Sequence, residues 1–298
     1  MAYLVMIRGL SMNLSLPEGV GFFPRAYTPE ELREAAERGT ILQATAVLCD
    51  ERHDLHVELG CRTGRIARKE AALGIADGSV RDIAILSRVG KPVCFRVLSA
   101  PPDGELVLSR RAAQEQALSA LLLLPPGTVL PAVVTSCAGF GAFCDIGCGV
   151  PALLGLERIC TARLRHPAER FTTGQRIFAA IESVDPLRRR VFLTHRELLG
   201  TWKENAALFR QGQTVTGIVR GVQDYGVFVE LTPNLSGLAD RFEGLQPGDA
   251  VSVYIKSIQP ERGKIKLSIL HRLAAPQPPK PLRYFKTSGS ISGWQYRG

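Results

Sequence analysis

The sequence contains no hydrophobic run long enough to cross a membrane. Its longest apolar stretches, near residues 1–7 and 118–124, are far shorter than the roughly 20 residues that a membrane-spanning helix needs. Residues 1–10 also lack the basic leading region and the small-residue cleavage site of a secretory signal. We therefore expect a cytoplasmic protein that is not inserted in a membrane. Residues 1–7 are either an ordinary strand or lie upstream of a true start at Met12.

Paired cysteine motifs are absent as well. The number of cysteines is odd and no Cys-x-x-Cys pair occurs among the seven, which are Cys49, Cys61, Cys94, Cys137, Cys144, Cys148 and Cys160. This usage favours free thiols in a reducing compartment over a disulfide framework. Cys144 and Cys148 flank a glycine-containing turn, but no second pair completes a set of four zinc ligands. The sequence thus predicts neither a metal site nor an organic cofactor.

Motifs for catalysis are also missing. No serine–histidine–acid set, phosphate-binding glycine-rich loop or pair of catalytic carboxylates stands out. We therefore predict that the chain is not an enzyme.

Acidic residues are scarce relative to basic ones. Lys and Arg number 37 against 28 Asp and Glu, which gives a formal net charge of +9 and a pI near 9.4. This balance favours an anionic partner, either a nucleic acid or an anionic membrane surface. With 298 residues, 45% of them hydrophobic, the chain is long enough for one large domain or several small ones.

A repeated motif organises the chain. Residues 139–147 carry Phe140 and Phe143 on either side of a glycine, and residues 224–231 repeat the pattern with Tyr225 and Phe228. The two copies align without a gap from residues 127 and 212 onward. Their second halves align too, except that the later copy lacks a helix-like segment which the middle copy has around residues 157–171. A fainter copy precedes both and has His53 and His56 near the aromatic positions.

The motif predicts an exposed aromatic platform. Residues three apart in a flat strand point to opposite faces, so we expect a bulge at Gly141 that lets Phe140 and Phe143 share one face. The following alternation directs Ala142 and Cys144 into a core. Two exposed rings on a sheet can stack on unpaired bases, a contact worth roughly 1 to 3 kcal/mol per base. The alternative is that both phenylalanines fill a core.

Short alternating strands with glycine at the bends predict a mainly β protein of three tandem five-stranded OB-fold barrels joined by short helices. The expected parts are an N-terminal leader with a short helix (1–37), a divergent first barrel (38–111), a helical linker (112–125), a second barrel (126–197), a second helical linker (198–210), a short third barrel (211–272) and a tail (273–298).

The leader and the tail have patterns of their own. Thr28, Pro29 and Glu31 have the spacing of a helix N-terminus with a capping box, and Gly39 suits its end. The tail begins with a proline-rich spacer over residues 274–281 and continues with basic and aromatic residues, including Arg283 and Trp294. These residues either bind a single nucleic-acid strand or pack against the last barrel.

The motif Gly139-Phe140-Gly141-Ala142-Phe143-Cys144-Asp145-Ile146-Gly147, followed by Leu193-Thr194, resembles the RNA-binding repeat of small-subunit ribosomal protein S1, the S1 domain. Residues 202–231 resemble a junction between two such repeats. The three copies together cover about residues 38–272. The resemblance implies OB-fold barrels that bind single-stranded RNA with low sequence specificity in a translation-related role, in contact with messenger RNA, the ribosome, or both.

The resemblance also implies which residues form the RNA face. In the middle copy they are Phe140, Phe143, Asp185 and Arg190, flanked by Arg188 and Arg189, with Gly155 at the position of the family histidine. In the last copy they are Tyr225, Phe228 and Lys264, with Asp240 and Gln259 at the histidine and aspartate positions. The first copy offers only His53 and His56, and Glu105 replaces a basic residue.

Simpler interpretations exist for several of these residues. The arginines of 188–190 could form a solvated hairpin, Asp185 could close the turn, and the two histidines could be ordinary surface residues. The alternative function is an adaptor that docks on the ribosome or an RNA-processing complex through its first barrel, or through its first and last barrels, with RNA contact limited to the middle one. We expect RNA binding mainly from Phe140 onward.

Overall fold

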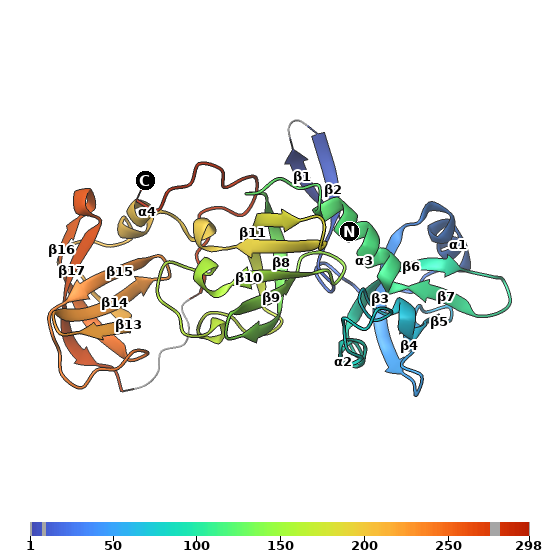
Figure 1. Ribbon diagram of the computed structural model, residues 1–298, viewed down its shortest axis with the longest axis horizontal. Coiled ribbons are helices and arrows are strands. Elements are labelled where there is room, and N and C mark those ends of the chain that lie inside the picture. Colours follow the sequence, from blue (N-terminus) through green and yellow to red (C-terminus); the bar gives the residue numbers. More distant parts are fainter. Residues whose placement is uncertain (1, 8–9, 275–280, 298) are drawn as a thin grey trace.

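The computed structural model describes residues 2–7, 10–274 and 281–297, and it consists mainly of strands. Three closed five-stranded barrels follow one another along the longest axis, with the first at the right of Figure 1 and the last at the left. This confirms the predicted fold class. Within the described ranges no helix is long and apolar enough to cross a membrane.

All three barrels have the same strand order. The first strand pairs with the second and the fourth, and a parallel contact between the third and fifth strands closes the barrel. The first barrel consists of β3 (Ile41–Cys49), β4 (Leu55–Glu58), β5 (Thr63–Ile66), β6 (Pro92–Ser99) and β7 (Leu106–Ser109). The second consists of β8 (Val129–Ala138), β9 (Gly141–Asp145), β10 (Pro151–Gly155), β11 (Arg176–Asp185) and β12 (Arg190–Thr194). The third consists of β13 (Thr214–Gln223), β14 (Gly226–Thr232), β15 (Leu235–Ala239), β16 (Ala250–Gln259) and β17 (Lys264–Arg272).

The predicted bulge at Gly141 is wrong. The register shifts one strand earlier, between Val134 and Ser136 of β8, and the other barrels have a shift at the matching place in β3 and β13. Gly141 serves a different purpose, since a Cβ atom there would lie 2.5 Å from the carbonyl oxygen of Leu154. Glycine therefore lets β10 approach β9 closely.

The segment between the third and fourth strands differs among the barrels. The first barrel has a 3₁₀ turn η1 (Arg68–Glu70) and the short helix α2 (Ile83–Leu86), and the second has the 3₁₀ turns η2 (Leu156–Arg158) and η3 (Pro167–Glu169). Residues 157–171 thus form two short turns in a loop rather than the expected helix. Residues 240–249 of the third barrel, all described, contain no helical turn.

Helices connect the barrels and the leader. Helix α1 (Pro29–Arg38) begins with the predicted capping box between Thr28 and Glu31 and packs Leu32 into the first core. Helix α3 (Arg110–Leu121) is capped by Ser109 and buries Ala113 and Leu118 against the second barrel. The second connection is broken into a 3₁₀ turn η4 (Arg196–Leu199) and the helix α4 (Trp202–Ala206) rather than one helix.

Buried charges join the first two barrels. The leader forms the hairpin β1 (Ala2–Ile7) and β2 (Leu10–Ser15) and then places the buried Glu18 between them. Glu18 accepts hydrogen bonds from Arg110 at 2.7 and 2.8 Å, and its backbone N–H donates to Asp145 at 2.8 Å. Because an unpaired buried charge is costly, these contacts favour one arrangement of the two barrels.

The tail returns along the second and third barrels (Figure 1). Ser290 bridges to Thr128, Tyr284 packs on the second core, and the backbone N–H of Trp202 donates to Tyr296. Tyr296 also packs against the third core. The proline-rich spacer falls largely on residues 275–280, which lie outside the described residues, as does Lys280.

Candidate nucleic-acid interface

The middle barrel exposes a pair of aromatic rings. Phe140 lies in the turn between β8 and β9 and is 62% exposed, and Phe143 lies within β9 and is half-buried. Their ring centroids are 5.9 Å apart with planes at 89°, an edge-to-face arrangement. Ala142 and Cys144 fill the core, as the alternation predicts. The turn, not a bulge in β9, brings both rings to the outside.

The rings continue into an apolar row across the sheet. Phe143 pairs with Leu153 of β10, and Leu153 pairs in parallel with Phe192 of β12. Both partners are half-buried. Sequence reasoning missed Leu153 and Phe192, although the buried Val191 and Leu193 on either side could have indicated that Phe192 points outward. The same alternation places Arg190 on the face of Phe192.

The hairpin between β11 and β12 supplies the basic residues. Asp185 closes it by accepting a hydrogen bond from the backbone N–H of Arg188 at 2.9 Å. Arg188 and Arg190 are exposed, and neither makes an ion pair with any described residue. Arg189 is different, because its guanidinium pairs with Glu115 of α3. The expected basic flank is therefore reduced to Arg188 and Arg190.

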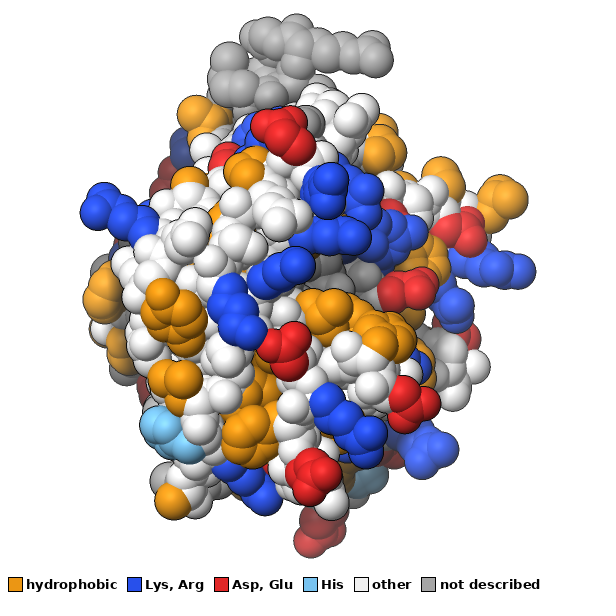
Figure 2. All heavy atoms as spheres, turned by 90° about the vertical axis from the view of Figure 1, so that its left-hand side faces the viewer, with side chains coloured by type: hydrophobic (Ala, Val, Ile, Leu, Met, Phe, Trp, Pro, Cys, Tyr) orange, Lys and Arg blue, Asp and Glu red, His pale blue; other side chains and the backbone are white. Residues whose placement is uncertain are grey.

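The last barrel repeats the arrangement. Tyr225, 69% exposed, and Phe228, 36% exposed, form an edge-to-face pair with centroids 6.1 Å apart. Phe228 pairs with Leu238, which pairs in parallel with Lys266, so a lysine takes the place of the third ring. Lys264 lies two residues earlier on the same face. Figure 2 looks onto this end of the molecule and shows basic side chains gathered in a band beside apolar ones.

Residues 123–196 match the model of the S1 RNA-binding domain. The match spans all five strands of the middle barrel, from β8 to β12. The chain is also similar to small ribosomal subunit protein bS1 over more than half of its own length. It is 32% identical to bS1 of Leuconostoc lactis over 186 residues, which are 57% of this chain and 43% of that protein. It is 31% identical to bS1 of Neisseria meningitidis over 206 residues, 63% of this chain and 36% of that protein.

The chain spans less than half the length of the curated relatives it matches. Among solved structures, it is similar to a multidomain protein with nucleic acid binding domains from Streptococcus pneumoniae. That similarity has 16% identity and a TM-score of 0.26 and covers 77% of this chain and 73% of the other.

The first barrel has His–Asp contacts where the other two barrels have their rings. His53, in a left-handed backbone conformation at φ 61°, lies 3.2 Å from Asp82, and His56 lies 3.0 Å from Asp50. The cross-strand partner of His56 is Arg65. The guanidinium of Arg65 binds the carboxylate of Glu105 at 2.5 and 2.7 Å and that of Asp54 at 2.8 Å. Hydrogen bonds from Arg65 hold the pKa of Glu105 below its usual value. The charge of Arg65 is therefore already neutralised within the protein.

Other predicted site residues also contact groups within the protein. Asp240 of the last barrel, at the position of the family histidine, binds Lys256 at 2.6 Å, and this contact lowers the pKa of its carboxyl. In the tail, the guanidinium of Arg283 lies 5.5 Å from the ring centroid of Phe285. Trp294 lies 6.2 Å from Tyr296, centroid to centroid. Neither Arg283 nor Trp294 belongs to the rows formed by the barrel strands.

The seven cysteines, all of them described, are unpaired thiols. In the part of the chain that the structure describes, no group of three or more His, Cys, Asp or Glu side chains is arranged to hold a metal ion.

Proposed function

We propose that this chain binds single-stranded RNA with low sequence specificity through its middle and last barrels. One observation supports this most strongly: two barrels present matching edge-to-face ring pairs, at matching turns, each beside basic side chains on the same face. Aromatic rings stack on any base, and Arg and Lys neutralise phosphates without reading sequence.

The proposal includes a translation-related role in the cytoplasm, with messenger RNA or the ribosome as the partner, and no catalytic activity. It is supported by the S1 match of residues 123–196 and by the similarity to bS1 proteins. Sedimentation with ribosomes tests this part. Loss of association after nuclease treatment indicates an RNA tether, and retention indicates direct docking.

A titration tests the RNA contact. Phe140→Ala combined with Phe143→Ala should weaken binding to unstructured RNA, because stacking on a ring is worth roughly 1 to 3 kcal/mol per base. Duplex RNA should bind less tightly than single strands to the parent. Phe23→Ala removes a ring that is 74% exposed outside the barrels and should leave affinity unchanged. Equal affinity of the double variant and the parent for single strands would contradict stacking.

The second candidate function is protein docking by the first barrel. Its ring positions hold His–Asp pairs, and its surface exposes several aliphatic side chains, namely Val47, Leu48, Ile83, Leu86 and Val89. An apolar surface without a platform suits a protein better than a polyanion. Association with ribosomes that survives both nuclease treatment and the loss of Phe140 and Phe143 would favour this function.

A further inference from the structure

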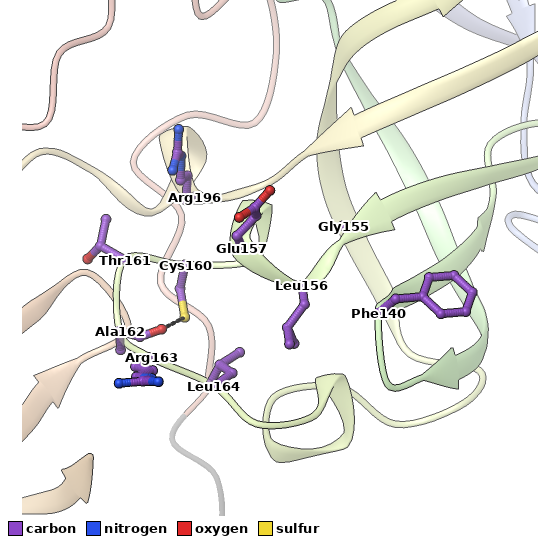
Figure 3. A pocket seen from close by; sticks show the side chains of 10 residues that line it. All are labelled: Phe140, Gly155, Leu156, Glu157, Cys160, Thr161, Ala162, Arg163, Leu164 and Arg196. Atoms are coloured by element: carbon purple, nitrogen blue, oxygen red, sulfur yellow. Dashed lines mark hydrogen bonds between the residues drawn. The ribbon is translucent and has the colours of Figure 1, made fainter. Parts of the chain in front are cut away.

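Two grooves meet at Arg163, in the loop between β10 and β11. The first, about 540 Å³ in volume, runs from Phe140 past Gly155 and Cys160 to Arg163 (Figure 3). The second, about 260 Å³, is lined by Arg163 on one side and by β13 of the last barrel on the other. Arg163 is thus shared by both grooves.

The second groove leads to the ring pair of the last barrel. Gly221 of β13 lines it and is the cross-strand partner of Phe228. A Cβ atom built on Gly221 would lie 3.9 Å from Cδ2 of the Phe228 ring. The two grooves therefore connect the rings of the middle barrel with those of the last barrel.

Buried contacts hold the loop and the last barrel together. The guanidinium of Arg170 lies 2.8 and 2.9 Å from the two carboxylate oxygens of Glu230, and Arg220 binds the same carboxylate at 2.6 Å. The backbone N–H of Ala162, next to Arg163, donates to the carbonyl oxygen of Pro233 at 3.1 Å. The path is therefore formed before any ligand arrives, which lowers the entropic cost of binding.

One arginine on the path is available to bind a polyanion. Four arginines and two glutamates line the two grooves. Arg165, Arg196 and Arg220 each have a glutamate partner. Arg163 is exposed, and within the described residues it makes no ion pair. Its guanidinium is therefore available to bind a phosphate.

We propose that one RNA strand occupies both ring pairs and crosses between them through these grooves, with Arg163 binding a backbone phosphate midway. This inference rests on the proposed function and adds a route and a residue to it. A strand held at two sites binds far more tightly than at either alone, because the second contact becomes intramolecular. The route makes both barrels act on the same RNA molecule.

Salt-dependent titration with an unstructured RNA of about 20 nucleotides, long enough for two OB barrels, tests the route. Each phosphate contact to a single strand contributes about 0.7 to the slope of log affinity against log salt. Arg163→Ala should therefore make the slope shallower by about 0.7, so that the parent-to-variant affinity ratio falls about threefold between 50 and 200 mM salt. Arg81→Ala, which removes an exposed arginine from the first barrel, should leave the slope unchanged.

A chemically altered RNA identifies the contact. Neutral methylphosphonate linkages in the middle third of the RNA should weaken binding by the parent. On this altered RNA, Arg163→Ala and the parent should have the same affinity. The melting temperature of Arg163→Ala should equal that of the parent, because the side chain is exposed.

These measurements distinguish a failure of the proposed route from a failure of the proposed function. Parent-like affinity and slope for Arg163→Ala, in a series where Phe140→Ala plus Phe143→Ala weakens binding, would overturn the route and leave the proposed function standing. An additional loss for Arg163→Ala on the neutralised RNA would also overturn it. No effect of the ring substitutions on any RNA would overturn both.

Discussion

The hydroxyl of Tyr284 lies 3.0 Å from Nε2 of His195 and ties the tail to the end of β12. Nδ1 of His195 lies 2.7 Å from the carbonyl oxygen of Ile159, which can only accept, so Nδ1 carries the proton and Nε2 accepts from the tyrosine. His195 is fully buried, and burial lowers its pKa to about 4. The neutral ring therefore needs a donor that the tail provides.

Tyr284→Phe removes that donor and should destabilise the protein. Leaving the buried Nε2 without a partner costs roughly 1 to 3 kcal/mol. The free energy of unfolding, measured by denaturant titration, checks this. Tyr225→Phe is the matched control. Tyr225 is 69% exposed, so the loss of its hydroxyl should hardly change the free energy of unfolding. Equal stability of Tyr284→Phe and the parent would show that the hydroxyl contributes nothing.

Asp145→Asn should change how stability depends on pH. Burial, together with the charge of Glu18, raises the pKa of Asp145 to about 7, although its carboxylate accepts backbone hydrogen bonds from Glu18, Gly147 and Gly149. Since the folded-state pKa is raised, the stability that protonated Asp145 contributes is complete at pH below about 4 and is lost as pH rises through about 7.

Asparagine keeps an acceptor oxygen and never ionises. The stability of Asp145→Asn relative to the parent should therefore rise between pH 4 and 7, with a slope of up to about 1.4 kcal/mol per pH unit, and level off above. Unfolding free energies at several pH values check this. A relative stability that is independent of pH would contradict the raised pKa.

Glu105→Gln should strengthen RNA binding by the first barrel. It removes one of the two carboxylates that bind Arg65 and frees the guanidinium edge that faces Glu105, while Asp54 stays bound to Nη1. Arg65 holds the register position that Leu238 has in the last barrel. We expect a higher affinity for single strands and a salt slope steeper by about 0.7, the value of one phosphate contact. Asp103→Asn removes an exposed acid from the same loop, and it should have a smaller effect. Identical effects of the two substitutions would indicate general charge rather than release of Arg65.

Local sequence patterns were sufficient for much of the fold. The capping box at Thr28 and Glu31 involves residues three apart, so a sequence alone can predict it. Strand alternation likewise indicated that Ala142 and Cys144 are buried, and the repeat placed Tyr225 beside Phe228. These signals depend on neighbours in the chain.

Those signals could not predict which residues meet across strands or between distant segments. The bulge lies in β8 and not at Gly141, because register depends on how two strands pair. The row from Phe143 through Leu153 to Phe192 joins three strands, and the partners of His53, His56 and Arg189 come from other segments. The same holds for Tyr284, which reaches His195 from a distant part of the chain.

The sequence by itself determined that this is a three-barrel protein with two aromatic motifs. Alternation of apolar and polar residues, glycines at bends and repetition can all be recognised from residues that are neighbours in the chain. Only the tertiary structure decided which charged groups remain free. Arg163 is exposed between the ring pairs without an ion pair among the described residues, whereas Arg65 and Arg189 are neutralised by Glu105 and Glu115. A charge acts on a ligand only when the fold has not already brought it a partner, and such partners are set by contacts between segments remote in sequence.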